Sequence, residues 1–301
     1  MFRRPARKLR DSFPALRRAW RPMFKRHVLT LALCIGAMMT CQGAMALDDA
    51  KAPPSEKEPL AIFRDPRHAM TKYIEGYRSG DATSSLDALR YAAQGGEALA
   101  RWKLGSMYAE GDGVPRDEAK AFQYFQQIIE AYDEANPNPR ERGVVASAFV
   151  AVGAYSLTGK PTKGIERNTA RAFEMFSYAA TEFGDMHAQY NLGLMYLEGS
   201  GITKDVRRGA RWLRLAADKQ HIESQAVLGR LYFNGIEGVP RQRALGLMYL
   251  TMARDGAGDP AKHKWIIDLY DGAMTTASDP DRQAALTYLE QFVKGRQEAR
   301  R

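Results

Sequence analysis

The sequence predicts an all-α chain that folds as an α-solenoid of antiparallel helix pairs. A Leu-Gly motif with similar neighbours recurs at Leu104, Leu192 and Leu228, and the last two motifs are 36 residues apart. A fixed period of this size is typical of helical repeat proteins. The apolar residues around each motif follow i, i+3, i+4 spacing, which places them on one face of a helix. With 301 residues, the chain is also longer than one compact core usually organises.

Residues 1–46 carry the net charge of the chain. The whole sequence has 44 Lys and Arg against 35 Asp and Glu, a formal charge of +9. Ten of the basic residues and one acid, Asp11, lie in this first segment, which leaves 34 basic and 34 acidic residues in the remainder. A neutral remainder argues against nucleic acid as a partner, because proteins that bind it are typically basic.

The same 46 residues have the order of a secretory signal. A basic stretch, Phe24–His27, precedes an apolar core, Val28–Met39, that is too short to span a bilayer. A small-x-small cleavage site ends at Ala46. We therefore expect export to the periplasm, cleavage after Ala46 and no membrane insertion of the mature chain. Met23 would start a signal of ordinary length and is a plausible true start.

Both cysteines of the chain, Cys34 and Cys41, lie within this signal. The mature chain is therefore expected to have no disulfide, no cysteine nucleophile and no cysteine-ligated zinc. Acylation of Cys41 in a lipoprotein is an alternative, although residues 38–40 form a poor lipobox.

The next segments are a leader and a first helix pair. Residues 47–66 contain three prolines and mixed charges between Asp48 and Pro59, so we expect them to be disordered. Residues 67–97 contain two short helical patterns, one built around Tyr73 and Tyr77 and one around Leu86 and Leu89. They predict a shorter N-terminal helix pair.

Four repeats are predicted over residues 98–256. The first helix of each full copy has Leu-Gly, then Tyr three residues later, then one or two exit glycines. These positions are Leu104, Gly105, Tyr108, Gly111 and Gly113; Leu192, Gly193, Tyr196, Gly199 and Gly201; and Leu228, Gly229, Tyr232 and Gly235. A degenerate copy lies around Val152 and Gly153.

The mid-helix glycines and the loop glycines need separate explanations. A glycine inside a helix costs about 1 kcal/mol relative to alanine. We expect close helix crossing to offset this cost, with an alanine of the second helix against the glycine backbone. The glycines that follow each first helix are expected to supply the positive φ of the exit turn.

The pattern from Ala100 to Asp117 resembles the Sel1-like repeat family, relatives of the tetratricopeptide (TPR) repeat. The N-terminal pair at residues 67–97 is TPR-like in the same sense. The run from Trp102 to Asp117, on an exported single array, is similar to the ExoR-type periplasmic regulators of α-proteobacteria. That resemblance implies a protein that binds the periplasmic domain of a membrane sensor histidine kinase and restrains it. It thereby implies control of exopolysaccharide and host-associated genes.

Two further regions complete the predicted architecture. An insertion near residues 133–147 breaks the repeat period, and its Asn-Pro-Asn-Pro sequence predicts an exposed loop from Asp133 to Gly143. Residues 257–301 are expected to form C-terminal capping helices. The last of these starts near Ser278 and has an apolar face made of Ala285, Leu286, Leu289, Phe292 and Val293.

A search for reaction chemistry finds no motif for a metalloprotease, a serine hydrolase, a nucleotide or a dinucleotide. The Asp spacing of a calcium loop is also missing around Gly111 and Gly113. We expect no enzyme activity, cofactor or metal. His187 and His221 occupy nearly equivalent inter-repeat turns, which favours a structural role over a ligand pair. A pH-sensing role is left open, because imidazole titrates near mild acidity.

The candidate partner-binding residues lie on successive first helices. Trp102 and Tyr190 share a position, two residues after the repeat alanine, where the pattern requires no fixed side chain. Aromatic and arginine side chains are enriched in protein interfaces. The predicted groove is lined or bordered by Arg101, Trp102, Lys103, Met107, Gln189, Tyr190, Asn191 and Arg230. Solvated helix faces with ordinary aromatic packing are an equal alternative.

Three function classes follow. A periplasmic regulatory binding protein agrees with the neutral charge and the resemblance. An envelope assembly or secretion adaptor would use the same groove on another partner. A cell-wall or β-lactam hydrolase is disfavoured, because the Sel1-repeat proteins associated with that activity are rich in cysteine.

Overall fold

A computed structural model describes residues 63, 65–80, 82–236 and 238–298. These residues form twelve α-helices and a short 3-10 helix, with no β-strand among them, which confirms the predicted all-α class. None of the helices in this part of the chain is long and apolar enough to cross a bilayer. The predicted export signal, with Met23 and both cysteines, and the leader as far as residue 62 lie outside the described residues and stay predictions.

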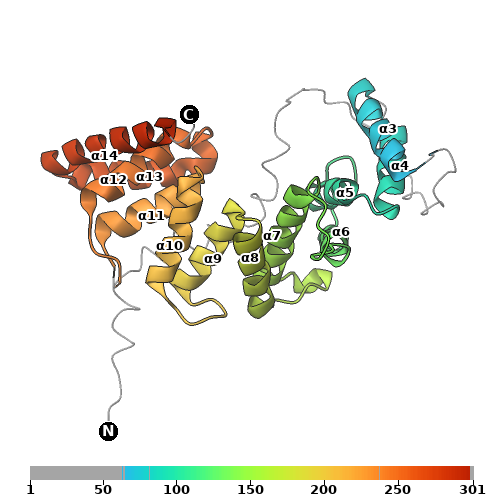
Figure 1. Cartoon of the computed structure of the whole chain (residues 1–301), viewed down its shortest axis with the longest axis horizontal. Coiled ribbons are helices and arrows are strands. Elements are labelled where there is room, and N and C mark those ends of the chain that lie inside the picture. Colours follow the sequence, from blue (N-terminus) through green and yellow to red (C-terminus); the bar gives the residue numbers. More distant parts are fainter. Residues whose placement is uncertain (1–62, 64, 81, 237, 299–301) are drawn as a thin grey trace, which may run out of the picture. The chain divides into compact units, whose positions relative to one another are not determined.

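The helices fall into two compact units that divide between Arg167 and Asn168 (Figure 1). The first unit contains α3 (Pro66–Ser79), α4 (Ala82–Gln94), α5 (Ala98–Glu110), α6 (Glu118–Glu130), α7 (Arg142–Thr158) and the 3-10 helix η2 (Pro161–Lys163). The second contains α8 (Thr169–Glu182), α9 (Met186–Glu198), α10 (Val206–Asp218), α11 (Ile222–Asn234), α12 (Arg243–Gly256), α13 (Pro260–Thr276) and α14 (Asp279–Glu298).

Side-chain caps start most of the second helices of the repeats. Asp117 accepts hydrogen bonds from two backbone N–H groups at the start of α6. Asn168 and Asp205 cap α8 and α10, each by accepting from one backbone N–H group. These caps satisfy backbone donors that have no partner inside the helix. Gln242 stands at the corresponding position before α12, and its side chain makes no cap.

The turn inside each of the three full repeats closes through one recurring backbone hydrogen bond. The carbonyl oxygen of the signature tyrosine accepts a bond from the residue just before the second helix. The bonds are Asp117 N to Tyr108 O at 2.8 Å, Asp205 N to Tyr196 O at 2.9 Å and Gln242 N to Tyr232 O at 2.7 Å. The exit glycines Gly111, Gly113, Gly199, Gly201 and Gly235 all have φ between 68° and 81°, as the sequence predicts. The signature tyrosines are not equally covered: Tyr108 is buried, whereas Tyr196 and Tyr232 are half-buried.

The mid-helix glycines lie at close helix crossings, as expected, but alanine is not the residue opposite them. A Cβ on Gly193 would lie 3.1 Å from the carbonyl oxygen of Gly209. A Cβ on Gly229 would lie 2.9 Å from the carbonyl oxygen of Gly246. The expectation of a facing alanine is therefore wrong for both crossings, since glycine meets glycine.

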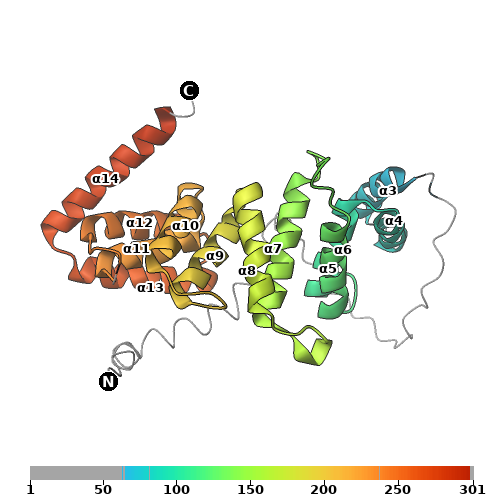
Figure 2. The same cartoon turned by 60° about the horizontal axis from the view of Figure 1, so that its bottom comes forward.

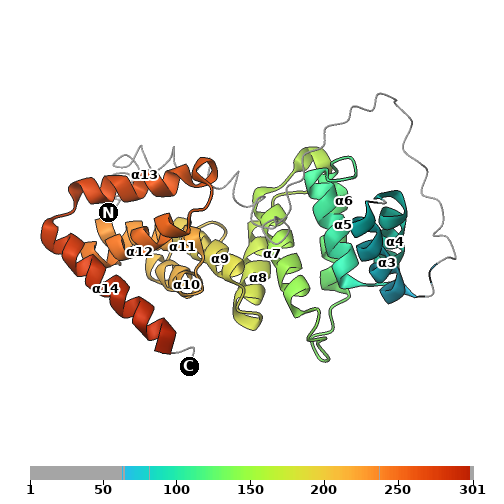
Figure 3. The same cartoon turned by 90° about the horizontal axis from the view of Figure 1, so that it is seen from above.

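The C-terminal helices cover one end of the second unit. α12 contacts both α13 and α14 (Figures 2 and 3). A core cluster joins Phe233, Leu247 and Leu250 to alanines of the last two helices, Ala273 and Ala285. The predicted apolar face of α14 is only partly covered, because Ala285 is buried whereas Leu286 is 53% and Val293 46% exposed.

The predicted insertion forms the connection between α6 and α7. Residues 133–140 are all exposed. Asp133 accepts hydrogen bonds from the backbone N–H groups of Ala135 and Asn136, which folds the first part of the loop into a turn. The loop ends at Glu141, because α7 begins at Arg142, and so is two residues shorter than the predicted loop that ends at Gly143.

Candidate functional site

The predicted binding residues of α5 divide into anchored and accessible side chains. Arg101 donates hydrogen bonds to the carbonyl oxygens of Ala93 and Gln127, at 3.0 and 3.1 Å, and so ties α5 to α6 and to the end of α4. Trp102 is half-buried, with its ring centroid 4.9 Å from that of Phe125. Met107 is half-buried as well. Trp102 is thus partly core and partly surface, which the sequence left undecided.

Exposed apolar side chains lie on α3 and α5, and the sequence interpretation missed them. Tyr77 is 67% exposed, Ile74 39% and Leu99 46%. The amino group of Lys103 lies 5.9 Å from the centre of the Tyr77 ring and 3.8 Å from a carboxylate oxygen of Asp112. Leu99 precedes Lys103 by four residues and so shares its helix face. The three-residue spacing of Leu99 and Trp102 carried this signal, but the sequence analysis did not consider Leu99.

Three candidates on α9 are interior residues, so their assignment to a partner-binding surface is wrong. Gln189 is 4% exposed, Tyr190 2% and Asn191 2%. The Tyr190 ring packs on the imidazole of His221, with 4.8 Å between centroids. The Asn191 amide donates to the carbonyl oxygen of His187, at 2.8 Å. α9 is therefore enclosed where α5 is accessible.

Arg230 on α11 is half-buried rather than a solvated groove residue. Burial lowers the pKa of its guanidinium to about 10, and the nearby Tyr190 opposes that shift. Burial also raises the pKa of Tyr190 above its ordinary value. Both groups belong to the polar interior of the second unit.

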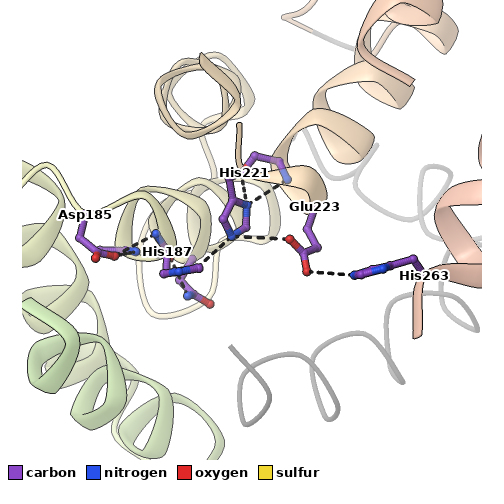
Figure 4. Close-up of polar contacts among 8 residues, drawn as sticks. Asp185, His187, His221, Glu223 and His263 are labelled. Carbon is purple, nitrogen blue, oxygen red and sulfur yellow. Dashed lines mark hydrogen bonds and ion pairs between the residues drawn. The ribbon is translucent and has the colours of Figure 1, made fainter. Parts of the chain in front are cut away.

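Figure 4 shows the polar cluster that this interior contains. His187 at the start of α9 lies against His221 before α11, with 3.0 Å between Nδ1 of His187 and Nε2 of His221. Glu223 lies beyond them, with carboxylate oxygens 3.7 Å from Nε2 of His221 and 4.0 Å from Nε2 of His263. Asp185 fixes the start of α9 by accepting from the backbone N–H groups of His187 and Ala188. The first turns of α9 and α11 and the start of α13 thus meet at one place.

The hydrogen bonds of His221 define its tautomer. The backbone N–H of Ser224 donates to Nδ1 of His221 at 3.2 Å, so His221 is the N-cap of α11. A nitrogen that accepts a hydrogen bond carries no hydrogen in the neutral ring. The ring hydrogen of His221 is therefore on Nε2, from which it donates to Nδ1 of His187. This pairing agrees with the structural role that the inter-repeat positions favoured.

Burial lowers the pKa of His221 to about 4; Glu223 opposes the shift and His187 adds to it. Burial dominates because the imidazolium would lose its hydration shell inside the unit. A neutral His221 is thus part of the folded state at neutral pH. Within the part of the chain that the structure describes, no group of three or more His, Cys, Asp or Glu is arranged to hold a metal ion.

Comparison with known proteins relates this architecture to one family. The Sel1 repeat model matches residues 98–133, 146–182, 187–221 and 222–256. The crystal structure of a Sel1 repeat protein from Oxalobacter formigenes superposes with a TM-score of 0.56 and 25% identity, covering 79% of this chain and 91% of that one. This likeness confirms the predicted α-solenoid.

Two relatives carry the same name, exopolysaccharide production negative regulator. The protein from Rhizobium meliloti is 31% identical over 261 residues, covering 86% of this chain and 91% of the relative. The protein from Rhizobium leguminosarum bv. viciae is 29% identical over 222 residues, covering 74% of this chain and 80% of the relative. The chain belongs to the Sel1-repeat family of exopolysaccharide production negative regulators, the ExoR type that its repeat sequence resembles.

Proposed function

We propose that this protein is an exported negative regulator of exopolysaccharide production that binds the periplasmic domain of a membrane sensor kinase and restrains it. The observation that carries the proposal is the extent of the similarity to a named negative regulator, 86% of this chain and 91% of the relative. An alignment of that length spans both units and the connections between repeats. It goes beyond what a shared repeat motif alone would produce.

A regulator that acts by binding needs an accessible surface with a few strong anchors. The first unit offers one on α3 and α5, which we call the α3–α5 patch: Ile74, Tyr77, Leu99, Trp102 and Lys103. It contains two aromatic side chains, Tyr77 and Trp102, of the types enriched among interface anchors, beside two aliphatic side chains and a cation. We propose that this patch contacts the sensor domain.

Isothermal titration of the full chain with the purified sensor periplasmic domain tests the proposal. Tyr77→Ala and Leu99→Ala should each weaken binding at least about tenfold, since anchor residues contribute about 1.4 kcal/mol or more. Tyr288→Ala on α14 is the matched control, because Tyr288 is also an exposed tyrosine, at 43%. The control should bind like the wild type. Absence of binding by the wild-type chain would contradict the kinase proposal, and capture of a different envelope protein would favour the adaptor interpretation.

The substitution Trp102→Ala distinguishes a side chain that contacts the partner from one that only packs within the protein. The ring contacts Phe125 and is half-buried, so its removal should lower the free energy of unfolding by about 1–3 kcal/mol, less than a fully buried aromatic residue costs. Binding measured well below the melting temperature then reports the contact itself. Normal melting together with normal binding would remove Trp102 from the patch.

A further inference from the structure

Helix α10 is unusual in charge. It contains four arginines and one aspartate, whereas the chain after residue 46 is balanced. With the flanking Lys204 and Lys219, residues 204–219 have six basic and two acidic side chains. Charge in the mature chain is therefore locally concentrated even though it sums to zero.

The four arginines of α10 are all exposed, and Arg214 also hydrogen-bonds to the buried Tyr249. The buried side of this helix is made of small and apolar residues, namely Gly209, Ala210, Leu213, Ala216 and Ala217. The opposite side exposes Arg207, Arg208, Arg211 and Arg214, at spacings of three and four residues. Side chains at such spacings are neighbours on a helix surface, so the four guanidinium groups form one continuous band.

Contacts within the unit hold part of this band in place without burying it. Nε of Arg207 donates to the carbonyl oxygen of Gly238 at 3.1 Å. Nε of Arg208 lies 3.3 Å from a carboxylate oxygen of Asp205, yet the Arg208 side chain is 58% exposed. A guanidinium has five N–H donors, so each of these arginines keeps most of its donors for an external acceptor.

The contact between Arg207 and Gly238 joins α10 to the loop that follows α11. That loop exposes Ile236, at 42%, and Arg241. Leu215, at 46%, is exposed one turn beyond Arg211. α9, α10 and α11 lie side by side in Figure 1, and α10 contacts both neighbours. We call this surface the basic face: Lys204, Arg207, Arg208, Arg211, Arg214 and Arg241, with Ile236 and Leu215.

We propose that the basic face binds the surface of an anionic phospholipid bilayer. Guanidinium groups match phosphate geometry better than ammonium groups, because two N–H donors engage two oxygens at once. Each basic residue near an anionic membrane adds to the electrostatic attraction. The two exposed aliphatic side chains among the cations suit the boundary between headgroups and acyl chains. This contact would keep the protein at a membrane surface independently of any protein partner.

The composition of the face favours lipid over an acidic protein. Protein interfaces concentrate their binding energy in clustered, desolvated anchors. Ile236 and Leu215 instead lie singly, one in a loop and one on the helix, and the cations are distributed over both elements. Mobile lipid phosphates can adapt to such a distribution, whereas a folded partner would need acidic groups at matching fixed positions.

Co-sedimentation with vesicles tests the proposal, using phosphatidylcholine alone or mixed with phosphatidylglycerol. The wild-type chain should bind only the mixed vesicles and should dissociate at high salt, where such attraction is screened. The double variant Arg207→Glu/Arg211→Glu should lower the partition coefficient at least about tenfold. Arg207→Lys/Arg211→Lys keeps the charge and should retain most of the binding.

Arg140→Glu/Lys163→Glu is the matched control, because it makes the same charge change at exposed positions of the first unit. It should bind vesicles like the wild type, and all variants should keep the wild-type helical circular dichroism. The assignment would be overturned if the control and the α10 variant lost vesicle binding equally. It would also be overturned if the α10 variant bound the vesicles as well as the wild type does. Loss of sensor-domain binding by the α10 variant, without vesicle binding by the wild type, would identify an acidic protein site instead. If the α10 variant still binds the sensor domain but no longer binds vesicles, the lipid contact is supported.

Discussion

The helix pairs α5/α6 and α11/α12 share the Leu-Gly signature but fill the space beside the glycine in different ways. A Cβ on Gly229 of α11 would meet the Leu250 side chain at 2.8 Å and two backbone atoms at 2.9 Å, the carbonyl oxygen of Gly246 and the nitrogen of Leu250. For a Cβ on Gly105 of α5, the three nearest atoms all belong to the ring of Phe125, with Cε1 at 2.5 Å. One crossing is backbone against backbone, and the other is backbone against an aromatic side chain.

The difference shows that one sequence motif supports two packing solutions. A side chain can shift or change rotamer when a neighbour grows, whereas two helix backbones in contact can separate only if the pair moves as a whole. The α11/α12 pair should therefore be the less tolerant of added volume.

The largest effect is expected for Gly246→Ala. A Cβ there would lie 2.4 Å from the backbone nitrogen of Phe233 and 2.7 Å from the carbonyl oxygen of Gly229. We expect a loss of about 3 kcal/mol in the free energy of unfolding, measured by urea denaturation. Gly105→Ala should cost less, about 1–2 kcal/mol, because the obstacle is a ring.

Gly272→Ala on α13 is the control for these two substitutions. Nothing lies within 4 Å of its Cβ position, so only helix propensity changes and stability should rise by about 0.5–1 kcal/mol. Equal losses for Gly246→Ala and Gly105→Ala would show that the two crossings do not differ in stiffness.

The next effect concerns how the first helices begin. α11 starts with the buried, neutral His221, whereas Glu97 before α5 makes no side-chain cap. The pKa of His221 is about 4 when folded, against 6.5 for an ordinary histidine, so the unfolded chain binds the proton more tightly. The stabilisation by neutral His221 is thus complete above about pH 6.5 and is lost progressively as pH falls towards 4, by about 2 kcal/mol at pH 5.

His221→Asn isolates this contribution, because asparagine is an equally good N-cap and does not titrate. Urea unfolding is measured at neutral pH and at about pH 5 for both proteins. Between these pH values, the free energy of unfolding should fall by about 2 kcal/mol less in the variant than in the wild type. His263, which faces Glu223, and His187, which contacts His221, are present in both proteins. The same acid sensitivity in both would disprove the role assigned to His221.

The smallest effect comes from the missing cap of α12. Asp117 caps α6, but Gln242 leaves the first N–H groups of α12 without a side-chain acceptor. Gln242→Asp should raise the free energy of unfolding by about 0.5–1 kcal/mol and so bring the two pairs closer together. Asp117→Ala should have the opposite sign and a similar size. No gain from Gln242→Asp would mean that the backbone before α12 cannot present the carboxylate to the helix.

Sequence periodicity predicted the helix pairs and exit glycines because both depend on residues within one repeat. The residue opposite each glycine was not predictable in this way. Gly209 and Ala210 are adjacent small residues on α10, and a rotation of one residue about the helix axis decides which of them faces Gly193. That rotation follows from packing between helices, which no single repeat encodes.

The candidate site shows the same limit. Trp102 and Tyr190 share a repeat position, yet one is half-buried and the other is enclosed. The difference arises from His221, whose ring covers Tyr190 from the following turn. The sequence placed His187 and His221 in equivalent turns but did not predict their contact or the proximity of Glu223, because these depend on the stacking of successive repeats.

The closing bond from the signature tyrosine has a practical consequence for protein engineering. The segment from Tyr232 to Gln242 is one residue longer than that from Tyr196 to Asp205, and both close with the same backbone hydrogen bond. Loop length is thus uncoupled from the geometry of the helix pair. In the corresponding loop of the first unit, Val114 is buried but Pro115 and Arg116 are exposed. A short fluorophore-binding peptide inserted between Pro115 and Arg116 should leave the helices on either side undisturbed, and would make the protein a reporter of its release from the proposed partner.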